Sequence, residues 1–177
     1  MLYGVQPSRR RDAQRNRLAI VEAANEVMTS PESVVLMPEI ARRAGVSLAT
    51  LYRHFRDRPA LVSAVVAYQL QRLETCASAI RPAAFRDLLG AVLHTQVAMR
   101  PLVRLVRHLD ARTRERYRQR LVTALSAPLR RAQDDGYVRA DVTPNDLELL
   151  LTMTRSVEDE DPDRAIALLL DGVFQPR

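Results

Sequence analysis

Apolar residues recur at helical spacing along most of the chain, and prolines and glycines mark the breaks between the helical segments. The segment 12–28, for example, places Ile20, Ala24 and Val27 on one face. The expected helices cover 12–28, two short segments within 36–58, and then 60–80, 83–99, 102–109, 112–135, 144–156 and 162–174. The sequence therefore predicts an all-α protein of about nine helices.

The stretch 36–58 predicts two short helices joined by a tight turn. Ile40, Ala41 and Ala44 form a narrow apolar stripe on the first helix, and the two alanines would let the second helix approach closely. Gly45 follows directly and can adopt the left-handed conformation that ends many helices. This arrangement is a helix-turn-helix, whose second helix enters the major groove of DNA.

The second helix of this stretch has distinct inner and outer faces. Ser47 can cap it by accepting a hydrogen bond from the backbone N–H of Thr50. Leu51 and Phe55 lie four residues apart and should pack inward. The residues left on or near the opposite face are Leu48, Ala49, Tyr52 and Arg53. These four side chains are the candidate readers of DNA.

Two of these side chains have more than one possible contact. The ring of Tyr52 can pack at a protein–DNA boundary while its hydroxyl donates to a phosphate. Arg53 can donate two hydrogen bonds to guanine O6 and N7, or it can contact the DNA backbone alone. The sequence leaves both contacts of Arg53 open.

The motif resembles the signature of the TetR-type (tetracycline-repressor-like) transcriptional regulators. The matching residues are Ala23, Ala24, Ile40, Ala41, Ala44, Gly45, Val46, Ser47, Thr50, Leu51, Tyr52, His54, Phe55 and Arg58. The resemblance implies a DNA-binding domain at 1–58 and a helical regulatory and dimerisation domain at 59–177. It further implies a homodimer that represses transcription at a palindromic operator and releases it when a small-molecule effector binds.

Two positions depart from the family pattern. Leu36 stands where members usually carry a Ser or Thr cap, with Pro38 in the first turn of the helix, where a proline is tolerated. Arg58 replaces the usual lysine and can hold the same phosphate.

Arg9, Arg10 and Arg11 form a basic arm that could reach DNA, or that could simply be solvated. The expected DNA-binding residues are Arg9, Arg10, Arg11, Ser47, Leu48, Ala49, Thr50, Tyr52, Arg53, His54 and Arg58.

The resemblance also suggests an effector pocket and a dimer interface. The expected pocket residues are Tyr68, Leu89, Leu93, His94, Val97, Leu102, Val106, Tyr117 and Leu121. His94 lies on a mostly apolar helix, where a histidine is more often part of the core than a ligand contact. The expected interface residues are Leu147, Leu150, Leu151, Ile166, Leu169, Leu170, Val173 and Phe174. Their alternative role is to complete the core of the monomer.

The composition is compatible with a nucleic-acid partner. The chain of 177 residues has a formal net charge of +6, and all 27 of its basic residues are arginines. With one cysteine, no expected signal peptide and no apolar run of membrane-spanning length, we expect a cytoplasmic protein without a membrane partner. The family resemblance implies that the protein is bacterial.

Charge is unevenly distributed in the second half of the chain. Residues 100–131 hold ten arginines and two acids, whereas 134–163 hold ten acids and two arginines. Salt bridges between neighbouring helices or protomers are the simpler explanation of this pattern. The alternative is that some of Arg100, Arg104 and Arg107 line a pocket for an anion, which only buried arginines without acidic partners would support.

The sequence offers no recognisable catalytic arrangement. His54, His94 and His108 are far apart, and none has a second histidine or a cysteine at helical spacing that would build a zinc site. We therefore expect no enzyme activity, no metal and no cofactor. Three functions remain open: an effector-responsive regulator, an effector-independent DNA-binding protein, and an enzyme with an appended DNA-binding module. An apolar pocket in the second domain would separate the first two.

Overall fold

The computed structural model describes residues 9–30, 36–154 and 161–175, and this part of the chain is helical. The elements are α1 (Arg9–Thr29), α2 (Met37–Arg43), α3 (Leu48–His54), α4 (Arg58–Ala79), the short 3-10 helix η1 (Pro82–Ala84), α5 (Phe85–Ala98), α6 (Arg100–Val106), α7 (Ala111–Asp134), α8 (Pro144–Thr154) and α9 (Pro162–Val173). The prediction of an all-α chain with about nine helices is confirmed.

Capping side chains set several helix limits and explain small differences from the prediction. Asp57 accepts a hydrogen bond from the backbone N–H of Ala60 at 2.8 Å, so α4 begins at Arg58 rather than at residue 60. Asp110 caps α7 through Thr113 in the same way. Gly136, at φ +76°, follows the end of α7, where the sequence placed a stop. The predicted end of the eighth helix, at 156, lies outside the described residues.

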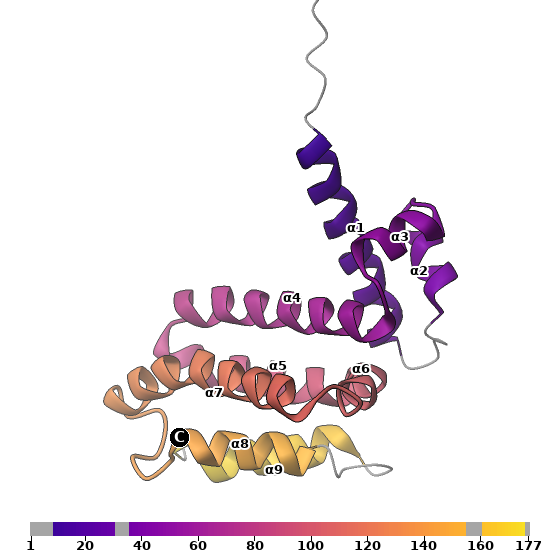
Figure 1. Ribbon diagram of the computed structural model, residues 1–177. Helices are drawn as coiled ribbons and strands as arrows, with labels where there is room; N and C mark the ends of the chain where they lie inside the picture. Colours follow the sequence, from indigo (N-terminus) through magenta and orange to yellow (C-terminus); the bar gives the residue numbers. More distant parts are fainter. Residues whose placement is uncertain (1–8, 31–35, 155–160, 176–177) are drawn as a thin grey trace, which may run out of the picture.

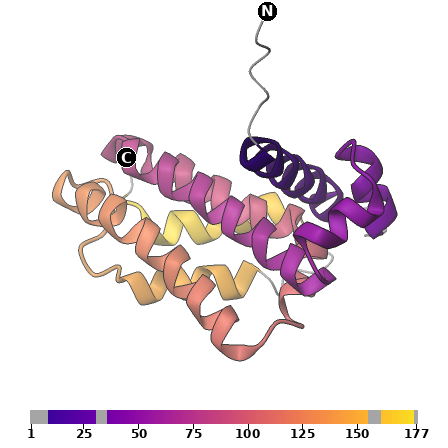
Figure 2. The same ribbon diagram turned by 45° about the horizontal axis from the view of Figure 1, so that its top comes forward.

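The helices form layers beside a small amino-terminal group (Figure 1). Helix α4 covers α5 and α7, which in turn lie over α8 and α9. Helices α1, α2 and α3 gather at the amino-terminal end of α4, with α1 steeply inclined to the layers (Figures 1 and 2). Because α4 is continuous from Arg58 to Ala79, it joins the two parts of the molecule without a flexible linker.

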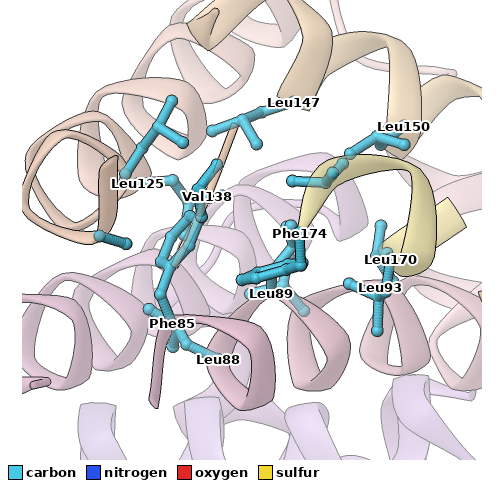
Figure 3. Packing of buried hydrophobic residues seen from close by; sticks show 14 of the residues in the cluster. Phe85, Leu88, Leu89, Leu93, Leu125, Val138, Leu147, Leu150, Leu170 and Phe174 are labelled. Atoms are coloured by element: carbon cyan, nitrogen blue, oxygen red, sulfur yellow. The ribbon is translucent and has the colours of Figure 1, made fainter. Parts of the chain in front are cut away.

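Two apolar clusters hold this arrangement together. The first core contains buried residues of α1 to α4 together with α6 and its flanks: Ile20, Ala24, Val27, Ile40, Leu51, Phe55, Leu61, Val65, Met99, Leu102 and Leu109, among others. The second core joins the end of α4 to α5, α7, α8 and α9: Ala77, Phe85, Leu89, Leu93, Leu125, Leu129, Leu147, Ile166 and Phe174, among others (Figure 3). Helix α6 thus packs with the amino-terminal helices, although the chain reaches it after α5.

The residues expected at a dimer interface lie inside the second core. Leu147, Leu150, Leu151, Ile166, Leu170, Val173 and Phe174 are buried within the protomer, and the partly buried Leu169 packs against them. The ring of Phe174 lies 6.0 Å from that of Phe85 on α5, centroid to centroid (Figure 3). These side chains therefore help to complete the monomer's own core, which is the alternative role that the sequence left open, and contact with a second chain stays a prediction.

Two neighbouring residues of α5 test this packing. Leu93 is fully buried, whereas His94 is exposed. We expect Leu93→Ala to lower the free energy of unfolding by about 2–5 kcal/mol, because it leaves a cavity in the core. His94→Ala is the matched control and should change it by less than about 0.5 kcal/mol. Urea unfolding followed by circular dichroism measures both, and equal losses would contradict the assignment.

Candidate nucleic-acid interface and adjoining cavity

The turn between α2 and α3 is fixed by backbone hydrogen bonds. The N–H of Val46 donates to the carbonyl of Ala41 at 3.0 Å, and the N–H of Gly45 donates to that of Arg42 at 3.2 Å. This pair of bonds is a Schellman motif, and it requires the positive φ of +66° that Gly45 adopts. The side chain of Val46 packs against the first core. The turn therefore sets the direction in which α3 leaves α2.

Helix α3 is anchored by its apolar underside. Leu51 is fully buried and Phe55 is nearly so, as the four-residue spacing predicts. The guanidinium of Arg17 on α1 lies 4.5 Å from the centre of the Phe55 ring, which adds a cation–π contact. At the start of the helix, Ser47 Oγ accepts from the N–H of Thr50 at 3.1 Å, which confirms the predicted cap.

The opposite face of α3 is open to solvent. Leu48 and Tyr52 are 40% and 45% exposed, and Ala49 and Arg53 are also exposed. Arg53 Nη2 donates to Thr50 Oγ1 at 2.8 Å, so the guanidinium lies along the first turn of the helix. The four side chains that the sequence named as candidate readers share an accessible surface.

Basic residues flank this surface. Arg10 and Arg11 are exposed in the first turn of α1, whereas the side chain of Arg9 lies outside the described residues. Arg58 is exposed at the first position of α4, and His54 is half-buried at the end of α3. DNA contacts by these residues remain a prediction.

Glu39 on α2 accepts hydrogen bonds from two further arginines of the same helix. Its carboxylate accepts from Arg42 at 2.8 Å and from Arg43 at 2.7 Å. These hydrogen bonds lower the pKa of Glu39 to about 2, so it is ionised at neutral pH. Leu36 makes no capping hydrogen bond at the start of α2, which agrees with the departure noted in the sequence.

A cavity of about 890 Å³ lies beside the amino-terminal group, between α1, α4, α5, α6 and α7. Four of the nine predicted pocket residues line it: Leu102, Val106, Tyr117 and Leu121. The hydroxyl of Tyr117 donates to the carbonyl of Ser63 at 3.1 Å and so fixes α7 against α4. Polar lining residues such as Asn25, Thr29 and Gln69 were missed, because a polar side chain on an amphipathic helix normally indicates a solvent-facing position.

The other five predicted pocket residues lie elsewhere. Leu89 and Leu93 are fully buried in the second core, against which Val97 also packs. Tyr68 packs against the first core. His94 is exposed, with its Nδ1 3.4 Å from the carboxylate of Asp163, so it is neither a pocket residue nor a core histidine. The prediction that these five residues line the pocket is therefore wrong.

Comparison with family models covers both halves of the chain. Residues 20–65 match the model described as bacterial regulatory proteins of the tetR family. Residues 81–174 match the model described as the C-terminal domain of SbtR-like transcriptional regulators. The chain belongs to the TetR family of transcriptional regulators. It is a DNA-binding transcription regulator, in a family whose members are generally not enzymes.

Solved structures of TetR regulators agree with this assignment. A TetR transcription regulatory protein from Mycobacterium vanbaalenii is 30% identical, with a TM-score of 0.74 over 94% of this chain and 99% of that one. A TetR transcriptional regulator from Streptomyces coelicolor is 27% identical, with a TM-score of 0.71 over 89% of this chain and 98% of that one. No curated protein matches the chain.

The described residues of this TetR-family regulator contain no group of three or more His, Cys, Asp and Glu side chains placed to hold a metal ion. Within the same ranges, no helix combines the length and apolar character needed to cross a membrane.

The roles of three α3 and α4 residues can be separated by mutation. We expect Arg53→Ala to weaken binding to the preferred duplex by about 1–3 kcal/mol and to relax the preference for one base at a single position. Loss of a bidentate contact with guanine would have this effect. Tyr52→Ala and Arg58→Ala should weaken binding to specific and unrelated duplexes alike, because phosphate contacts carry no sequence information. Titration and footprinting at fixed salt, on duplexes selected from a random pool, measure this. An equal loss on every sequence for Arg53→Ala would assign Arg53 to the backbone.

Proposed function

We propose that this TetR-family regulator is a repressor that binds a palindromic operator as a homodimer and leaves it when a small molecule enters the cavity. The observation that carries the proposal is the position of the cavity, whose wall includes Asn25 and Thr29 of α1. Helix α1 packs against both α2 and α3. A molecule in the cavity would therefore touch the helix that supports the DNA-binding surface.

The proposed DNA contacts divide into two kinds. Leu48, Ala49 and Arg53 on the exposed face of α3 would meet base edges in the major groove. Phosphates would be held by the surrounding polar and basic residues, which are Arg9, Arg10, Arg11, Ser47, Thr50, Tyr52, His54 and Arg58. As a bacterial transcription regulator the protein would act in the cytoplasm, without a catalytic role.

The cavity favours this function over an effector-independent DNA-binding protein. Ligand pockets commonly have volumes of roughly 300–1,000 Å³ and mostly apolar walls. The cavity of about 890 Å³ falls in this range, and its wall includes Leu70, Val92 and Leu102. A protein that bound DNA constitutively would have no use for such a space between its two cores.

We propose that the two protomers of the homodimer meet through the outer faces of α8 and α9. Although the inner faces of these helices are buried, Leu149 and Leu168 are 56% and 54% exposed, and Met153 is 47% exposed. Leu149 and Met153 lie four residues apart on α8 and therefore share a face. The pair α8 and α9 also forms the outermost layer of the molecule (Figure 1). Two such faces related by a two-fold axis would match a palindromic operator.

Charge placed on this surface should separate the protomers. We expect Leu149→Glu combined with Leu168→Glu to convert a dimer into a monomer, because the association would bury two unpaired carboxylates from each protomer. Analytical ultracentrifugation measures the change, and selection from a random DNA pool should yield inverted repeats for the wild type only. Tyr137→Glu, at an exposed tyrosine outside α8 and α9, is the control and should stay dimeric. A wild-type protein that is monomeric, or that selects no inverted repeat, would contradict the proposal.

The link from the cavity to DNA would run through a hydrogen bond between α1 and α4. Gln69 Nε2 donates to Asn25 Oδ1, the pair is partly buried, and both residues line the cavity. A ligand polar group at this wall would compete for the same amides. Loss of the bond would free α1 to shift on α4 and so change the spacing of the two α3 helices in the dimer, which must match half-sites about one helical turn apart.

A double-mutant cycle tests this link without the natural effector. We expect Asn25→Ala and Gln69→Ala each to weaken DNA binding about three- to tenfold, because a loosened α1 adds an ordering cost to association. The double variant should lose no more DNA affinity than either single variant, since each substitution removes the same hydrogen bond. Exposed Gln119→Ala on α7, outside this cavity, is the control. Additive losses in the double variant would contradict a shared role.

A further inference from the structure

The wall of the cavity carries an excess of positive charge. Arg72 of α4, Arg107 after α6, and Arg114 and Arg118 of α7 all line it, and Glu115 is the one acidic residue among its described lining residues. An uncharged cavity would serve for a purely apolar ligand. Four guanidinium groups around one space favour a ligand that carries negative charge.

The partners of these arginines differ. Arg118 is paired with both Glu115 and Glu148, so its charge is neutralised within the protein. The guanidinium of Arg72 lies 5.9 Å from the ring of Tyr68, and Arg114 Nη1 donates to the carbonyl of Arg107 at 3.3 Å. Within the described residues, no acidic side chain forms an ion pair with Arg72, Arg107 or Arg114. All three side chains are exposed, so they line the cavity where it opens to solvent, and their charges remain available to a ligand there.

Arg107 and Arg114 form a local group within the lining. The hydrogen bond between them places the end of α6 beside the first turns of α7. Arg104 and Arg100, which the sequence also suggested for an anion, do not line the cavity. The buried anion site that the sequence left open is not found, because Arg107 and Arg114 are exposed. These two arginines instead lie where the cavity opens to solvent, and Arg72 adds to the positive potential there.

Most of the remaining wall is apolar. The side chains that form it come from α4, α5, α6 and α7 and include Val66, Leu70, Leu73, Leu88, Val92, Leu102, Val103, Val106 and Leu121. A small inorganic anion would leave this apolar surface in contact with water. A ligand with an apolar body would cover it and gain free energy in proportion to the buried area.

We propose that the cavity binds an amphipathic organic anion, with an aliphatic or aromatic body against the apolar wall and one acid group at Arg107 and Arg114. This rests on the proposed function, because it names the chemical class of the effector. Guanidinium groups suit such a ligand, since they offer paired donors to a carboxylate or sulfonate. Cationic compounds of the same shape would be repelled.

Two dyes of matched shape test the proposal. Anilinonaphthalene sulfonate carries an acid group, N-phenylnaphthylamine has the same rings without it, and both fluoresce more strongly in apolar surroundings. We expect the intact protein to bind the anionic dye at least about fivefold more tightly, as a partly solvated charged hydrogen bond would provide. Arg107→Gln combined with Arg114→Gln should abolish that preference and leave binding of the uncharged dye unchanged.

Two further variants make the result specific. Arg112→Gln combined with Arg130→Gln removes the same charge from exposed positions of α7 outside the cavity, and it should keep the preference. Val103→Trp fills part of the cavity and should weaken the binding of both dyes. Equal affinity of the intact protein for the two dyes, equal effects of the two arginine pairs, or no effect of Val103→Trp would each overturn the proposal.

The same samples are tested for binding to duplex DNA, which separates this proposal from the proposed function. DNA binding without a preference for the anionic dye would refute the ligand class and leave the regulator role standing. A preference for the anionic dye with no binding to any palindromic duplex would support the ligand class and contradict the repressor.

Discussion

The burial of Leu51 and Phe55 in the first core is the interaction on which the exposed face of α3, the proposed DNA-binding surface, depends. These two side chains fix the rotation of α3 about its own axis, and with it the identity of the residues that face solvent. A helix of seven residues has little stability by itself, so its orientation comes from packing, from the Ser47 cap and from the turn at Gly45 that ends α2. The exposed side chains of α3 are the consequence of what its inner face touches.

Helix α4 extends this constraint to the rest of the molecule. Its first half contributes Leu61 and Val65 to the first core, and Ala77 near its end belongs to the second. Since one rigid helix serves both clusters, the cavity beside it is not isolated from the DNA-binding group. The Asn25 to Gln69 hydrogen bond crosses the same region. Ligand binding and DNA binding would therefore share structural elements, as coupling between two sites requires.

Sequence patterns predicted the helices and the exposed face of α3 because local signals determine them: four-residue apolar spacing, the Ser47 cap and the glycine turn. They left two roles open for the apolar residues of α8 and α9, because α8 carries leucines on both faces and periodicity could not tell Leu147, which is buried, from Leu149, which is exposed. The cavity was only partly predicted for a related reason. Asn25 and Gln69 are polar, and only tertiary packing turns them toward an internal space.

The most direct test of the central claim is a cross-link from the outer face of α3 to DNA. A benzophenone is attached to a cysteine introduced by Ala49→Cys, in a protein whose own Cys76 is changed to serine. Irradiation with a selected duplex is expected to join the protein to bases within each half-site. The same label introduced by Arg130→Cys should give no such product. Cross-linking of Arg130→Cys but not of Ala49→Cys would contradict the assignment of α3 as the helix that reads DNA.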